Sequence, residues 1–303
     1  MVFAFQRADL DVADNVRRTA REEFDLAIAE VGETGFEVHD TVRNVRRRLK
    51  RIRSLLRLIR PVLPDYAAEN AALRDIGAEV SALRDARALV EAAERLGRAS
   101  DPALAASIGR WRRHLMGRAA GLEADLDREV FLLDLRTKLR EARVRSELWE
   151  LTGTGRRSIV PGVTAAYRKA RRGYRVAARS PEDDELFHEW RKHLKHHLGH
   201  LKLLRDLTPA FALERRRRMS RLATILGDIQ NLCVLRDALP EAPEAQDQIG
   251  AALAGQLAKE RRRALRAGKR LFREKPRVIR HRWHVYFEDW RSAQKLLHGA
   301  SER

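Results

Sequence analysis

The 303-residue sequence contains a single cysteine, Cys233. One cysteine excludes an intrachain disulfide and a thiolate metal cluster, and it is typical of a protein kept in a reducing compartment. No apolar run approaches the length of a membrane span, and the first residues lack the basic and apolar segments of a secretory signal. We therefore expect a cytoplasmic protein with no membrane insertion.

Aromatic residues and enzyme motifs are also scarce. Aromatic side chains make up only 6% of the chain, so few are available to stack on the bases of a single-stranded nucleic acid. The sequence contains no Walker-type loop, no dinucleotide fingerprint and no His-Glu-x-x-His motif, and the Gly-Thr-Gly at residues 153–155 is too short for a nucleotide loop. We predict a non-enzymatic protein with no catalytic residues and no cofactor.

Positive charge is abundant in this chain. Its 62 basic residues exceed its 43 acidic residues and leave a net charge of +19, which predicts an anionic partner. Arginine outnumbers lysine by 52 to 10. A planar guanidinium can bind two oxygens of a phosphate or carboxylate at once, although a GC-rich genome would produce the same excess. The sequence leaves both explanations of the arginine content open.

Nearly the whole chain is predicted to be helical. Ala, Arg, Leu and Glu dominate, strand-like alternation is absent, and Pro and Gly lie mainly near expected helix ends. We expect helices at about residues 9–31, 38–60, 66–96, 102–150, 162–179, 182–206, 211–238, 244–273 and 277–298. The Gly-rich stretch 152–162 is the best linker, so we place a first helical bundle at residues 1–155 and a second at residues 156–303.

One segment combines an apolar seam with a stripe of like charges. Between residues 42 and 61, nine of twenty residues are Arg or Lys and none is acidic. The apolar residues alternate in spacings of three and four, as in a helix packed in a bundle. The basic residues repeat this spacing one position later. Two cations about 7 Å apart repel by roughly 2 kcal/mol at an effective dielectric of about 20, so such a stripe favours an anionic partner.

The same pattern recurs in the second half of the chain. At an offset of 145 residues, the segment 187–205 again places apolar residues in the seam and basic residues in the stripe, with Leu198 in place of Arg53. Residues 73–89 match residues 219–235 at an offset of 146. We therefore expect an all-α protein built from two repeated helical bundles, whose two stripes converge on one shared basic groove.

The second half also resembles a known family, the conserved histidine α-helical domain or CHAD family. The resemblance is carried by "FHEWRKHLKHHLGHLKLL" (187–204) and "LGDIQNLCVL" (226–235), with "YRKARRGY" (167–174) before them and "LFREKPR" (271–277) after them. It implies two four-helix-type bundles related by pseudo-twofold symmetry around a basic cavity or pore. It also implies non-catalytic binding of inorganic polyphosphate, often at polyphosphate granules, where granule-associated proteins are possible further partners.

The stripes and the resemblance together provide the candidate residues for polyphosphate binding. They are Arg43, Arg46, Arg47, Lys50, Arg53 and Arg57 in the first half, and His188, Arg191, Lys192, Lys195, Lys202 and Arg205 in the second. Second-tier candidates are His39, Arg168, Arg171 and Arg172. The first half departs from the family pattern, because the signature histidine falls on Arg43 while His39 lies one turn earlier. The second half has Asn231 where the family often has an acid, and Asp85 keeps that acid in the first half.

Two alternatives come from other motifs. The segment "HLKHHLGH" (193–200) contains two i,i+4 histidine pairs, but lysines on the same helix would repel a dication, so we predict no metal site. We expect His197 in the seam and the other histidines of this segment to be exposed. The runs "ERRRRMSRL" (214–222) and "KERRRALRAGKR" (259–270) suggest the main alternative, a nucleic-acid-binding or architectural protein that uses an outer basic surface.

Overall fold

The computed structural model describes residues 3–32, 38–124, 126–210 and 212–301, and within these ranges the chain is helical with no strand. The α-helices are α1 (Val12–Gly32), α2 (Val38–Ile59), α3 (Tyr66–Glu79), α4 (Ser81–Arg98), α5 (Pro102–Ala124), α6 (Arg128–Glu147), α7 (Arg156–Ala177), α8 (Asp184–Leu203), α9 (Ala212–Asp237), α10 (Gln246–Leu271) and α11 (Pro276–Ser301). Two short 3₁₀ turns, η1 (Arg205–Leu207) and η2 (Leu239–Glu241), flank α9. The all-α prediction is confirmed.

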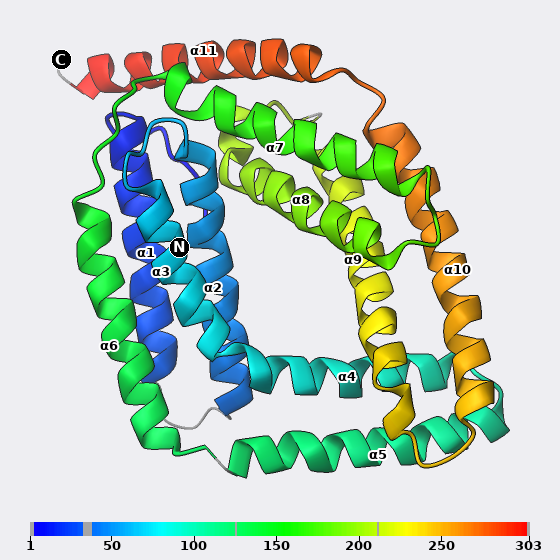
Figure 1. Cartoon of the computed structure of the whole chain (residues 1–303). Helices are drawn as coiled ribbons and strands as arrows, with labels where there is room; N and C mark the ends of the chain where they lie inside the picture. The colour runs from blue at the N-terminus through cyan, green and yellow to red at the C-terminus, as the bar shows by residue number, and fades with distance from the viewer. Residues whose placement is uncertain (1–2, 33–37, 125, 211, 302–303) are drawn as a thin grey trace.

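The helices lie along the four sides of a frame (Figure 1). In this view α1, α2, α3 and α6 form the left side, α4 and α5 the bottom, α9 and α10 the right side, and α7, α8 and α11 the top. Contacts of α2 with α4, α4 with α9, α9 with α8 and α8 with α2 close the frame. The two predicted halves meet where α2 contacts α7 and α8 and where α4 and α5 contact α9 and α10, respectively.

Two expected long helices are each divided in the structure. The stretch 66–96 breaks at Val80, whose side chain is fully buried and whose carbonyl accepts a hydrogen bond from Arg46 Nη1 at 3.3 Å. The stretch 102–150 breaks before α6, where the Asp127 side chain accepts from the Val130 backbone N–H at 3.1 Å. Such caps satisfy helix-end donors. The apolar periodicity of the sequence continues across both breaks and therefore did not predict them.

Helix α7 begins at Arg156 and not at residue 162 as expected, so Pro161 lies inside the helix. Proline removes the hydrogen bond that residue 161 would donate to the carbonyl of residue 157. Pro161 is exposed, so water can reach this part of the helix. Gly155 immediately precedes α7 with φ of 56°, a conformation that glycine adopts without strain.

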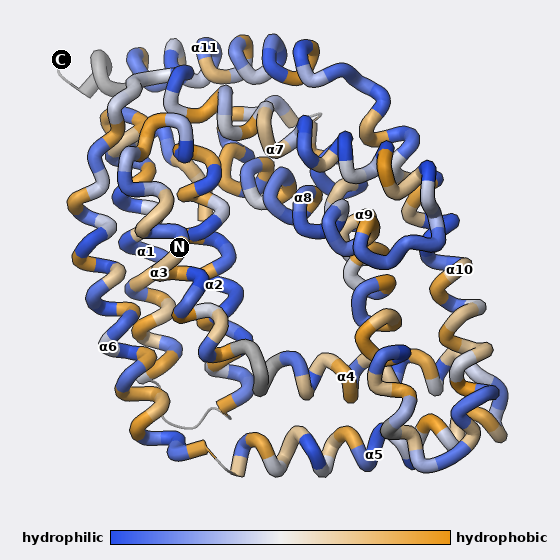
Figure 2. The backbone as a smooth tube through the Cα atoms, viewed as in Figure 1, coloured by the Kyte–Doolittle hydropathy of each residue, from blue (hydrophilic) through white to orange (hydrophobic). Residues whose placement is uncertain are grey.

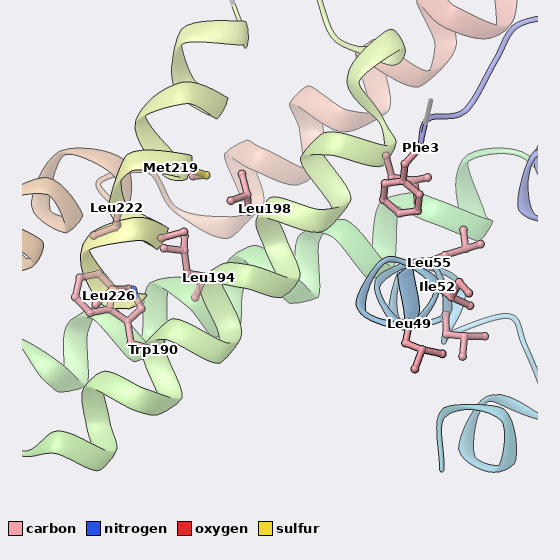
Figure 3. Close-up of a cluster of buried hydrophobic side chains, with 14 of the residues drawn as sticks. Phe3, Leu49, Ile52, Leu55, Trp190, Leu194, Leu198, Met219, Leu222 and Leu226 are labelled. Carbon is pink, nitrogen blue, oxygen red and sulfur yellow. The ribbon is translucent and has the colours of Figure 1, made fainter. Parts of the chain in front are cut away.

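The apolar seams predicted from the sequence form the core. Leu49, Ile52 and Leu55 of α2 are buried, and Phe3 packs in the same cluster. Figure 3 shows Trp190, Leu194 and Leu198 of α8 beside Met219, Leu222 and Leu226 of α9. Figure 2 shows hydrophilic stretches on both α2 and α8, as expected for helices that bury one face. None of the helices in the described ranges combines the length and the hydropathy that a bilayer span requires.

Two glycines allow the halves of the frame to approach each other closely. A Cβ atom at Gly162 of α7 would lie 1.8 Å from the carbonyl oxygen of Leu58 in α2. A Cβ atom at Gly199 of α8 would lie 2.2 Å from Ser54 Oγ, also in α2. Because the atom facing Gly162 belongs to the backbone, it cannot rotate away. Any larger residue at 162 must push α7 away from α2.

We expect Gly162→Ala to lower the free energy of unfolding by more than about 2 kcal/mol, because the added methyl group overpacks a backbone contact. Urea unfolding followed by circular dichroism measures this change. The control is Gly117→Ala on α5, where an added Cβ meets nothing within 4 Å. It should raise the free energy of unfolding by about 0.5–1 kcal/mol through helix propensity alone. A stabilising effect of Gly162→Ala would contradict the close α2–α7 contact.

Candidate functional site

The crossing of α2 and α8 brings basic side chains from both halves together. At its centre His200 Nε2 lies 3.1 Å from the backbone carbonyl oxygen of Ser54. A carbonyl can only accept, so Nε2 carries the proton in this contact. Because Gly199 has no Cβ atom, α8 approaches α2 closely enough for this hydrogen bond to form. His200 is 1% exposed, so water does not compete for the carbonyl.

Four side chains around this contact form what we call the crossing cluster: Arg53, Arg57, His196 and His200. Burial, with a further contribution from the Arg57 charge, lowers the pKa of His196 to about 3. Burial also lowers the pKa of His200 to about 3, although its bond to Ser54 acts in the opposite direction. Both histidines are therefore neutral at pH 7, and the two arginines supply the charge of the cluster.

Arg57 carries its charge in this cluster without a carboxylate partner. Burial, followed by the charge of Arg53, lowers the pKa of Arg57 to about 10, so it remains protonated at pH 7. Its Nη1 donates to the Arg53 carbonyl at 2.9 Å, and Arg53 Nε donates to Asn70 Oδ1 at 3.2 Å. No acidic side chain within the described ranges pairs with Arg57. A bound anion would remove this electrostatic cost.

Arg191 on α8 is in a similar position. Burial lowers its pKa, and its Nε is buried with no hydrogen-bond partner in the part of the chain that the structure describes. The corresponding Arg46 of the first half donates to the Val80 carbonyl, and its Nη2 lies 3.8 Å from Asp85 Oδ1. At a sequence offset of 146 residues, position 231 matches Asp85 and is Asn. Arg191 makes no ion pair with a described residue, whereas Arg46 lies near Asp85.

His188 lies one turn before Arg191 and contacts α9. Its Nδ1 is in hydrogen-bond contact with Gln230 Oε1. The contact holds the ring against α9 and occupies one of its two nitrogens, so the other can still serve as a donor or acceptor. His188 and Arg191 therefore mark the α8–α9 junction as a second place where candidate residues gather.

The other candidates on α2 lie away from the crossing cluster. Arg43 Nη2 lies 2.8 Å from Asp40 Oδ1, and its side chain is 57% exposed. Arg47 Nη2 lies 3.8 Å from Glu30 Oε1 and is similarly exposed. Lys50 is also exposed. The charges of Arg43 and Arg47 are therefore balanced by local carboxylates and by water.

The remaining candidates of the second half are paired with local acids, exposed, or partly buried beside other cations. Lys192 Nζ forms an ion pair with Glu189, and Arg205 Nε lies 3.4 Å from Asp206 Oδ1. Lys195 is exposed on α8. Burial, followed by two neighbouring arginines, lowers the pKa of Lys202. Those neighbours are Arg51 and Arg216, neither of which belongs to the crossing cluster.

The second-tier candidates are spread over three places. His39 lies 3.9 Å from Glu123 Oε1 at the end of α5, so it sits at the corner of α2 and α5. Arg171 Nε donates to the Phe272 carbonyl at 3.0 Å and ties α7 to the end of α10. Arg168 and Arg172 are exposed on α7. None of these four contacts the crossing cluster within the described residues.

Sequence reasoning placed the histidines of α8 only in part. His197 is 2% exposed, so its predicted position in the apolar seam is confirmed. The expectation that the other histidines of the segment are exposed was wrong: His200 is buried against Ser54, and His193 and His196 are only partly exposed. The i,i+4 pair His196/His200 next to Gly199 was the signal available in the sequence. Periodicity alone could not show that α2 covers this side of α8.

The geometry first defines a class: an all-helical protein in which helices from two halves cross and hold half-buried arginines that have no carboxylate partner within the described residues. The particular family follows from comparison with known proteins. The family model of the CHAD domain matches residues 20–240, and the chain belongs to this family. No curated protein matches the chain.

Two solved structures share the fold. A crystal structure of the CHAD domain from the plant Ricinus communis aligns with a TM-score of 0.54 at 18% identity, covering 91% of this chain and 97% of that one. PptA from Streptomyces chartreusis aligns with a TM-score of 0.57 at 18% identity, covering 87% of this chain and 98% of that one. At this identity the similarity extends to the fold.

Because His200 is buried with a low pKa, we predict that the free energy of unfolding falls as the pH falls below about 6.5. A histidine whose pKa falls to about 3 on folding is neutral in both states above pH 6.5, so its contribution is complete there and is lost as the pH falls. Between pH 7.5 and pH 5, the difference in unfolding free energy between wild type and His200→Gln should change by about 2 kcal/mol, with wild type losing more. Urea unfolding at several pH values measures the difference.

The control for this experiment is His114→Gln, which replaces an exposed histidine on α5. Its unfolding free energy should follow that of wild type at every pH. The His200→Gln substitution also removes the bond to Ser54, but this loss shifts the whole curve and does not change its slope. Parallel curves for wild type and His200→Gln would show that His200 is protonated as readily in the folded protein as in the unfolded chain.

Proposed function

We propose that this protein binds inorganic polyphosphate without catalysing a reaction, and that Arg57 of the crossing cluster and Arg191 of α8 are central to the binding. One observation carries the proposal. In a chain with a net charge of +19, these two arginines are partly withdrawn from water with no carboxylate partner within the described ranges. Polyphosphate binding is also what the resemblance to the CHAD family implies.

Polyphosphate matches the chemistry of these side chains. Each phosphate unit carries about one negative charge and presents acceptor oxygens on several sides, so successive arginines can each donate charge-assisted hydrogen bonds. Neighbouring cations that repel one another in the free protein would share one polyanion. The exposed Lys50 and Lys195, and His188 at the α8–α9 junction, can extend the contact along the polymer.

The order of helix contacts supports the proposal that the halves are repeats. In the first half α1 contacts α2 and α6, and α4 contacts α5; in the second, α7 contacts α8 and α11, and α9 contacts α10. We assign residues 1–155 and 156–303 to two related bundles. The shared basic groove would then lie where α2 and α8 cross, because these helices carry the two repeated stripes.

The place of action is part of the same proposal. We place the protein in the cytoplasm at polyphosphate granules, where granule-associated proteins are further candidate partners. The main alternative is nucleic-acid binding through exposed arginines of α9, where Arg217, Arg218 and Arg221 have only Glu214 as an ion-pair partner within the described residues. These side chains are exposed and would bind any phosphate backbone.

Binding to immobilised polyphosphate tests the assignment of residues. The double variant Arg57→Gln, Arg191→Gln should bind at least tenfold more weakly than wild type, because each lost charge-assisted hydrogen bond contributes about 1.5–3 kcal/mol. The matched control is Arg262→Gln, Arg266→Gln, which removes the same charge from exposed positions of α10 and should bind within a fewfold of wild type. Circular dichroism checks that each variant keeps its helicity.

The same assay distinguishes the alternatives. Equal loss of binding in both double variants would show that net charge alone matters. Duplex DNA that displaces polyphosphate efficiently at matched salt would favour the nucleic-acid alternative, since a polymer without bases should otherwise compete better. Release of phosphate from polyphosphate in the presence of magnesium or manganese, above the background without protein, would contradict the non-enzymatic part of the proposal.

Thermal unfolding gives an independent prediction. Excess long-chain polyphosphate should raise the melting temperature, because it binds the folded state and relieves repulsion between buried arginines. The shift should shrink when sodium chloride is raised from about 0.05 M to about 0.5 M, as salt screens the charges and competes for them. Differential scanning fluorimetry measures both effects. An unchanged melting temperature at low salt would count against a built anion site.

A further inference from the structure

A cavity of about 690 Å³ lies between the end of α8, the start of α9 and the first turns of α11. Its volume is in the range of pockets that hold small organic ligands. Its lining residues include none of the crossing cluster, so it is a different place from the polyphosphate site proposed above. Nothing in the proposed function accounts for a cavity here.

Part of the lining of this cavity is apolar, and we call this part the floor. Its apolar lining side chains are Leu201, Val278, Ile279, Trp283, Val285 and Tyr286. Ile279 and Trp283 are each 4% exposed and belong to the core. By contrast, Val278 and Val285 of α11 are 43% and 46% exposed. A ligand with an apolar body would remove this surface from water.

Another part of the lining is cationic, and we call this part the edge. Three arginines line it, and the carboxylate of Glu274 is bonded to two of them: Arg215 Nη1 donates to it at 2.8 Å and Arg282 Nη1 at 3.2 Å. The third, Arg216, makes no ion pair with any described residue. The positive charge of Arg216 helps to lower the pKa of Lys202. The cavity edge therefore carries more positive than negative charge.

A polar atom also lies unpaired beneath the cavity. His197 lines it, is 2% exposed, and packs edge-on against Tyr167 with ring centroids 5.4 Å apart. Its Nδ1 has no hydrogen-bond partner within the described part of the chain. A buried polar atom without a partner lowers the stability of the protein, so this part of the lining is not optimised for packing alone.

From these features we infer a binding site for a small amphipathic anion: a molecule with an apolar body, such as an aryl group or a medium-length alkyl chain, and one phosphate or carboxylate group. The apolar body occupies the floor formed by α11, and the anionic group binds at the edge beside Arg216. Inorganic polyphosphate has no apolar part and does not fit this description. The inference therefore does not depend on the proposed function.

Fluorescence of 8-anilinonaphthalene-1-sulfonate, an aryl sulfonate, tests the site. The probe should bind the folded protein at a single saturable site with increased emission. Decyl phosphate and decanoate should displace it, and the stronger of the two identifies the preferred anionic group. Decanol, which lacks the charge, and inorganic phosphate, which lacks the apolar body, should each displace the probe at least tenfold less efficiently.

Two variants locate the binding. Ala212→Trp at the first position of α9 fills the cavity that Ala212 lines and should abolish saturable probe binding. Ala254→Trp, on the exposed face of α10, adds the same side chain elsewhere and should leave binding unchanged. Arg216→Gln removes no ion pair within the described residues and should weaken decyl phosphate about tenfold while changing decanol little.

Specific results would overturn the inference. Probe binding that persists in Ala212→Trp, with wild-type affinity and with helicity retained, would place the site elsewhere. Decanol that competes as well as decyl phosphate would show that the cationic edge contributes nothing. Loss of binding in Ala254→Trp as strongly as in Ala212→Trp would show that the probe reports general surface hydrophobicity. Any of these results leaves the polyphosphate proposal unaffected.

Discussion

The close approach of α2 to α7 and α8 is the constraint on which the rest of this structure depends. At Gly162 the backbone of α7 faces the Leu58 carbonyl of α2 directly, and at Gly199 only the small Ser54 side chain lies between α8 and α2. The Ser54 carbonyl accepts the hydrogen bond from His200. An approach this close leaves no room for water, and every charged side chain near it loses hydration. The low pKa values of His196, His200 and Arg57 are consequences of this packing.

Helix α2 separates its many cations into two kinds. On one side Arg48 and Arg51 bond to Glu23 of α1, which is 3% exposed, so buried carboxylates neutralise them. On the other side Arg57 lies near His196 and His200 of α8, and no acidic side chain within the described residues pairs with it. If stability alone were favoured, Arg57 would also be paired with a carboxylate, because a charge that is withdrawn from water without a partner is costly. The arrangement around Arg57 is consistent with the proposal that a bound anion supplies the negative charge.

Much of the framework could be predicted from the sequence, because apolar periodicity reports which face of a helix is buried. It placed α2 and α8 within a few residues and showed their repeated stripes. It could not place the break at Val80, because a buried valine in a seam looks the same in a bent helix as in a straight one. It also could not show that His200 faces α2, because this depends on how two distant helices cross. Local patterns carry little information about such long-range contacts.

The same limit explains why the candidate residues do not form one continuous site. A row of basic residues on a helix favours anion binding where a neighbouring helix shields it from water and no local acid pairs with it. Arg191 meets this condition because it is partly buried with no carboxylate partner among the described residues, whereas Arg46 has Asp85 at 3.8 Å. A polyanion would therefore gain more from Arg191 than from Arg46, since the anion must compete with Asp85 for Arg46. Two stripes that match in sequence thus differ in the charge that each leaves available to a ligand.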